Sequence, residues 1–180
     1  MFERIMNLFR SNSAVRPEDA RLGEVIISVT MRLIALDVLK NETRMVPILQ
    51  IPYAKQYIAG ALLNVFFYSY RQAAKPLLQF HPDAVLKVLL RNLGKDCETG
   101  YRQVEEIGTM MSKSGAPLMS DMPLVSRCIV AEMCIHKVVF RSAVPEKEFD
   151  VFRRKFLESA EILWRAYERA CGQLQKDAAL

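Results

Sequence analysis

The hydrophobic pattern of the chain is helical almost throughout, and it is densest in one segment, residues 52–75. The run 56–70 carries no charged residue, and the wider stretch 48–82 contains neither Asp nor Glu. Pro52 suits the first turn of a helix, the alanines and leucines that follow favour helix, and Pro76 ends it. We therefore predict a helix at about 52–75 that is apolar on nearly every side.

A helix of this kind belongs either in a protein core or in a membrane. Its uncharged run is shorter than the roughly 20 apolar residues that a membrane-spanning helix needs, and Gly60, Asn64 and Ser69 interrupt it. The pattern favours a core helix, with membrane insertion as the alternative. In a core the Asn64 amide must find hydrogen-bond partners, either within the protein or on a ligand or partner.

Further stretches place apolar residues on one face at helical spacing, and prolines stand near their starts. They predict helices over residues 17–40, 82–93, 100–113, 122–141 and from 145 to about 172. The fold class that follows is all-α. We expect a single domain, residues 17–175, of about six or seven helices packed around the central apolar helix.

Residues 1–12 form a separate part of the prediction. One stripe of a short amphipathic helix carries Phe2, Ile5, Met6 and Phe9, and a linker of small and polar residues follows it. Since a helix of about ten residues is unstable alone in water, it must pack on its own core, in a partner's groove or on a membrane surface. Its polar side carries two Arg and one Glu, and this small basic excess favours a protein groove.

The last predicted helix is the most regular, and its apolar stripe is rich in aromatic residues. Trp164 stands beside this stripe and Tyr167 lies on it. Core packing explains such a stripe, but its length and aromatic content also suit a partner-binding or self-association surface. Trp164 and Tyr167 are therefore candidate contact residues, together with the N-terminal stripe.

Charge and cysteine usage narrow the functional classes. The chain has 25 basic and 20 acidic residues, and no predicted helix carries a dense basic face, so nucleic-acid binding is not favoured. The four cysteines form no C-x-x-C pair and fall in or beside apolar helical patterns, which is typical of reduced, buried thiols in a cytoplasmic protein. The N-terminus lacks the apolar core of a signal peptide.

One polar constellation stands out, on the helix predicted over 122–141. Cys128, Glu132 and His136 follow each other at intervals of four residues. Glu132 and His136 would be near enough to hydrogen-bond, an arrangement that can serve general-base chemistry but is more typical of an ordinary helical pair. We predict no catalytic residue, no metal site and no cofactor.

The sequence therefore predicts a non-enzymatic, α-helical protein-interaction protein: an adaptor, a chaperone or an assembly component of a larger complex. Its partner would be another protein or a second copy of the chain. Two alternatives stay open. One is a peripheral membrane protein anchored by the N-terminal helix, and the other is a helical domain that binds an apolar ligand between its helices.

Overall fold

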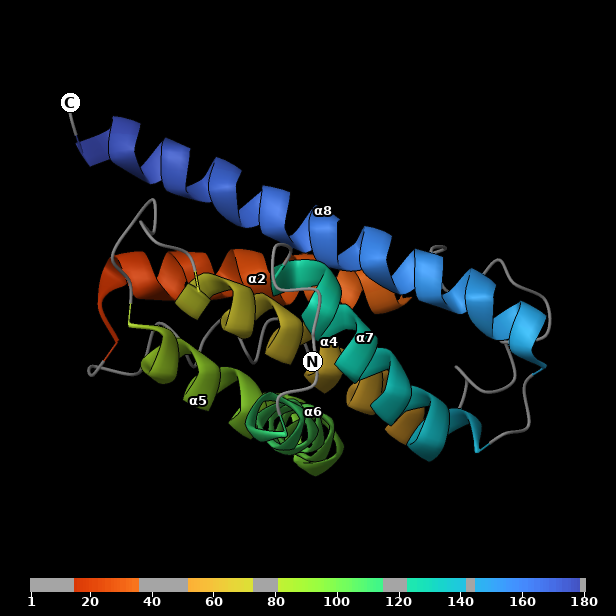
Figure 1. Ribbon diagram of the computed structural model, residues 1–180. Coiled ribbons are helices and arrows are strands. Elements are labelled where there is room, and N and C mark those ends of the chain that lie inside the picture. Colours follow the sequence, from red (N-terminus) through yellow and green to blue (C-terminus); the bar gives the residue numbers. More distant parts are fainter. Residues whose placement is uncertain (1–14, 36–51, 73–80, 115–122, 142–144, 179–180) are drawn as a thin grey trace.

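A computed structural model describes residues 15–35, 52–72, 81–114, 123–141 and 145–178. These ranges contain six α-helices and no strand, which confirms the all-α, single-domain prediction (Figure 1). The helices are α2 (Pro17–Ala35), α4 (Pro52–Gln72), α5 (Pro82–Leu93), α6 (Lys95–Lys113), α7 (Pro123–Ile135) and α8 (Glu146–Ala178). A π-helical turn, His136–Phe140, continues α7.

The central position of α4 is confirmed as well. This helix contacts α2, α5, α6, α7 and α8, and every residue from 57 to 67 is buried. The apolar run of the sequence is therefore a core element. None of the helices in the described ranges combines the length and the apolarity that crossing a membrane requires.

The crossing of α4 and α6 is close and depends on two glycines. A Cβ atom on Gly60 would collide with the backbone carbonyl oxygen of Cys97, and one on Gly100 would collide with the carbonyl oxygen of Tyr57. Only residues without a side chain allow the two backbones to approach this closely. The crossing fixes the neighbouring turns of α4 and α6, which hold the site described below.

The longest helix, α8, lies along one side of the molecule and packs against α2, α4 and α7 (Figure 1). Its predicted stripe is buried at Phe149, Phe152, Phe156, Ala160, Leu163 and Tyr167. The Tyr167 ring packs edge-on against Phe66 and Tyr70 of α4, with centroids 5.4 and 5.8 Å apart. Aromatic packing therefore joins α8 to the central helix.

The structure differs from the predicted boundaries in three places. Helix α8 continues past Gly172, which does not adopt a left-handed conformation, and ends at Ala178. Helix α6 begins at Lys95, not at residue 100, because Gly94 with φ of 91° ends α5 and leads directly into α6. The predicted helix 122–141 widens into a π turn at His136 and ends at Arg141, whose φ is 48°. Hydrophobic spacing carried no sign of that π turn.

Candidate functional site

The site is organised around Arg127, one of two charged residues in the mostly apolar helix α7. Its side chain is only 6% exposed. Its Nε donates a hydrogen bond of 2.9 Å to Oδ1 of Asn64, and its guanidinium carbon lies 4.3 Å from the centre of the Tyr68 ring. The other end of the Asn64 amide donates to the carbonyl oxygen of Tyr101 at 3.0 Å. Two contacts from α4 therefore fix the orientation of the guanidinium.

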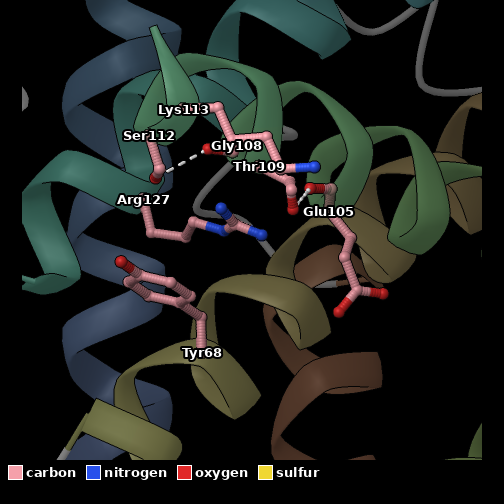
Figure 2. Close-up of a pocket in the computed structure, with 7 residues that line it drawn as sticks. All are labelled: Tyr68, Glu105, Gly108, Thr109, Ser112, Lys113 and Arg127. Carbon is pink, nitrogen blue, oxygen red and sulfur yellow. Dashed lines mark hydrogen bonds between the residues drawn. The ribbon is translucent and has the colours of Figure 1, made fainter. Parts of the chain in front are cut away.

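The guanidinium lies beside a pocket of about 350 Å³ between α4, α6 and α7 (Figure 2). The lining residues are Tyr68, Glu105, Gly108, Thr109, Ser112, Lys113 and Arg127. Gly108 makes room for the cation, because a Cβ atom there would overlap Nη1 of Arg127. The absence of a side chain on α6 therefore admits the guanidinium at this point.

No carboxylate in the described part of the chain forms an ion pair with Arg127. Glu105 lines the same pocket, but its carboxylate points away from the guanidinium and lies 3.6 Å from Nη1 of Arg71 (Figure 2). Burial lowers the pKa of Arg127, although the electrostatic effect of nearby groups, Tyr68 and the Glu105 carboxylate among them, partly opposes it. The guanidinium still remains protonated at neutral pH because its ordinary pKa is so high.

Two of the three hydroxyl groups that line the pocket have partners within the protein, and the third belongs to Tyr68. Thr109 donates to the carbonyl oxygen of Glu105 at 2.8 Å, and Ser112 donates to that of Gly108 at 2.9 Å (Figure 2). Among the described residues, the donors left unused at the pocket are therefore the terminal nitrogens of Arg127, the Tyr68 hydroxyl and the exposed Lys113. A planar guanidinium with free terminal N–H groups matches a carboxylate or a phosphate.

The predicted polar constellation is not brought together in the way its spacing suggested. Glu132 is buried, and its Oε2 lies 3.1 Å from Nε of Arg153 on α8. The His136 ring packs edge-on against Phe149, with centroids 4.5 Å apart. Glu132 therefore joins α7 to α8, and His136 joins the π turn to α8. Asn64 belongs to the site around Arg127. Burial raises the pKa of Glu132 to about 7, against the opposing effect of Arg153.

The predicted contact residues of the last helix have different environments. Tyr167 is 2% exposed, so it is a core residue and presents no side chain to a partner. Trp164 is half-buried, donates a hydrogen bond of 3.0 Å to Glu168, and packs against Phe66. The N-terminal candidates lie outside the described residues, and their role stays a prediction: Phe2, Ile5, Met6 and Phe9.

The cysteines are free and buried, as their pattern predicted. Burial raises the pKa of Cys97 to about 12 and that of Cys134 to about 11, and it also raises those of Cys128 and Cys171. Since the thiolate is the reactive form, these side chains behave as small apolar groups. Within the described ranges, no three His, Cys, Asp or Glu side chains are grouped as metal ligands.

Sequence reasoning missed Arg127, although a signal was present. The segment PLVSRCIVAEMCI places one arginine among apolar residues, where it must either reach solvent or find buried partners. Asn64 was singled out as a buried amide, and it supplies one of those partners. The contribution of Gly108 was not visible, because it depends on how α6 faces α7.

Comparisons of the chain with protein-family models, with curated proteins and with solved structures found no match.

Proposed function

We propose that this protein is a non-enzymatic interaction protein and that its partner places an anionic group on Arg127. The observation that carries the proposal is a guanidinium that is 6% exposed, oriented by Asn64 and Tyr68, and in no ion pair with a carboxylate of the described residues. A buried charge without a counter-ion costs folding free energy. A bound anion would offset that cost and form charge-assisted hydrogen bonds with the guanidinium.

Binding accounts for the lining residues better than catalysis does. A nucleophile needs an adjacent base that takes up its proton, yet the Thr109 and Ser112 hydroxyls both donate to backbone carbonyls. The buried thiols are held in their unreactive form by their raised pKa values. These features support a recognition role for the pocket, in keeping with the interaction function expected from the sequence.

The test is a titration of the full-length protein with sodium acetate at constant ionic strength, followed by NMR at the arginine Nε–Hε groups. We expect one resonance to shift in a saturable manner, with a dissociation constant in the millimolar range, or about 4 kcal/mol of binding free energy. Loss of that resonance in Arg127→Gln would assign it. The exposed Arg154 offers a matched control, since Arg154→Gln removes the same charge from the surface and should leave the titration unchanged.

A second variant guards against loss of folding in Arg127→Gln. Gly108→Ala keeps the arginine but places a methyl group where Nη1 lies, so the guanidinium must move. We expect this variant to fold and to lose acetate binding. A titration of the parent that shows no saturable shift up to about 100 mM acetate, well above the millimolar range, would mean that Arg127 is only a structural tie to Asn64.

A further inference from the structure

A second cavity adjoins the Arg127 pocket on the same helix. It has a volume of about 650 Å³ and lies between α5 and α6. Leu86 and Leu90 of α5 and Met110 of α6 supply its apolar lining, and Met110 is 61% exposed. A large apolar side chain this exposed on the wall of a groove is available for contact with a partner. We call this cavity the α5–α6 groove.

The groove and the Arg127 pocket are neighbours, because Glu105 and Thr109 line both of them. These two residues are one helical turn apart on α6. Thr109 donates its hydroxyl to the carbonyl oxygen of Glu105, so the boundary between the cavities presents no unused hydroxyl donor. One elongated ligand can therefore cross α6 here and occupy both cavities.

Charges at the two ends differ and give the ligand a direction. The pocket is lined by two cations, Arg127 and Lys113, and by one carboxylate, Glu105, which pairs with Arg71. At the groove, Arg102 pairs with Glu98 at 2.6 Å, and Glu106 adds a negative charge. A carboxylate is therefore favoured at the pocket and disfavoured at the groove, where Leu86, Leu90 and Met110 favour an apolar side chain.

We infer that the occupant is an acidic peptide segment that places a carboxylate on Arg127 and an apolar side chain in the α5–α6 groove; this inference rests on the proposed function. A peptide fits better than an alkyl chain, because charged Arg102, Glu105 and Glu106 alternate with the apolar lining. The two ends are separated by roughly the 10–12 Å width of a helix. An extended peptide covers that distance in about three to four residues and turns alternate side chains to one face.

The probe is the pentapeptide acetyl-Asp-Ser-Leu-Ser-Leu-amide with a fluorescein label at its C-terminal end, and binding to the full-length protein is measured by fluorescence anisotropy. Its aspartate and both leucines lie on one face when the peptide is extended. We expect saturable binding that weakens at least about tenfold when the aspartate is replaced by asparagine or when both leucines are replaced by serine.

Met110→Asp tests the groove without touching Arg127. We expect it to weaken peptide binding about tenfold and to leave the acetate titration of Arg127 unchanged. Met133→Asp is the matched control, because Met133 is also exposed, at 51%, but lies on α7 and lines neither cavity. Gly108→Ala should abolish binding of both peptide and acetate.

The outcomes separate the two proposals. Acetate binding without peptide binding, or peptide binding that Met110→Asp leaves unchanged, would overturn the groove inference while Arg127 remains an anion site. Failure of acetate to bind would remove the basis of both. Co-sedimentation with phosphatidylserine vesicles that Met110→Asp abolishes, without peptide binding, would overturn the peptide in favour of a lipid surface.

Discussion

Arg127 carries a full charge inside a contact between three helices, and Asn64 determines which way that charge points. The amide accepts from Nε of Arg127 and donates to the carbonyl oxygen of Tyr101, so each polar end of Asn64 has a partner. A hydrogen bond to a charged group contributes about 1.5–3 kcal/mol, and losing one partner leaves the other buried and unsatisfied. Asn64 and Arg127 should therefore depend on each other energetically.

A double-mutant cycle measures this dependence. We expect Asn64→Leu to lower the free energy of unfolding by about 2–4 kcal/mol, because it leaves a buried cation with one contact fewer. Arg127→Met should cost about 1–3 kcal/mol by leaving the Asn64 oxygen unsatisfied. The double variant should be more stable than the sum predicts by about 1–2 kcal/mol, since no unpaired polar group remains at either position.

Urea unfolding of the four proteins gives these values, with Asn64→Leu combined with Arg154→Met as the control pair. Arg154 is exposed on α8, so that pair should be additive. Additivity of Asn64→Leu and Arg127→Met within about 0.5 kcal/mol would show that their hydrogen bond contributes nothing to stability.

At the scale of single residues, the sequence predicted which side chains are buried better than it predicted which side chains they contact. The apolar residues around Asn64 in the sequence predicted that its side chain is buried, and the structure confirms this, because Asn64 is 1% exposed. The same reasoning paired Glu132 with His136 because they are four residues apart, whereas Glu132 pairs with Arg153 of another helix. Local spacing cannot supply a partner that is distant in sequence. For the same reason Arg127 could not be assigned to Asn64, 63 positions away.

The α4–α6 crossing shows how two elements set the geometry of the site. Gly60 and Gly100 bring the backbones together, and the same two helices then carry Asn64 and Tyr68 on one side and Gly108 on the other. A separation of the helices would move Gly108 away from the guanidinium. The geometry at Arg127 therefore depends on the crossing at Gly60 and Gly100, although neither glycine lines the pocket.

Two glycine substitutions that we expect to change the stability of the protein in opposite directions test this crossing. Gly60→Ala should destabilise the protein by about 1–3 kcal/mol, because the new methyl group meets backbone of α6 that cannot rotate away. That loss outweighs the gain in helix propensity of about 1 kcal/mol. Gly172→Ala in α8 meets nothing within 4 Å, so only the propensity gain should appear.

Thermal and urea unfolding of both variants provide the measurement. Gly172→Ala controls for the intrinsic effect of replacing a helical glycine by alanine. If Gly60→Ala is as stable as Gly172→Ala, the two backbones are not in contact at the crossing.

Elements were more predictable than their ends and contacts. Apolar spacing and prolines located all six described helices, and the charge-free run identified the central one. The start of α6 was placed five residues too late, because Lys95 and Asp96 are polar and gave no hydrophobic signal. The π turn at His136–Phe140 packs against Phe149 and Phe152 of α8, which are contacts that local spacing does not encode.

At the scale of the whole molecule, α8 is the element whose attachment combines aromatic packing with ionic contacts at both ends. Near its C-terminal end Asp177 lies 3.0 Å from Arg21 of α2, and near its N-terminal end Arg153 pairs with Glu132. The Arg21–Asp177 pair is exposed and contributes little. Glu132 is buried, so its protonation affects the stability of the entire fold.

The dependence of stability on pH follows from the pKa of Glu132. Burial raises this pKa from its ordinary value of 4.5 to about 7, so the folded protein binds a proton between these pH values that the unfolded chain has already released. The contribution of the protonated Glu132 is therefore complete below about pH 4.5 and is lost as the pH rises through about 7. We expect the parent to lose on the order of 1–3 kcal/mol relative to Glu132→Gln across this range.

Urea unfolding of both proteins at several pH values from 4.5 to 8 measures the difference, in which all other titrating groups cancel. Glu158→Gln is the control, because it removes an acidic side chain that is 56% exposed on the same helix. A constant difference between parent and Glu132→Gln would mean that Glu132 titrates equally in the folded and unfolded chains. A parent that gains stability relative to Glu132→Gln as the pH rises would reverse the sign, and the ion pair with Arg153 would then outweigh burial.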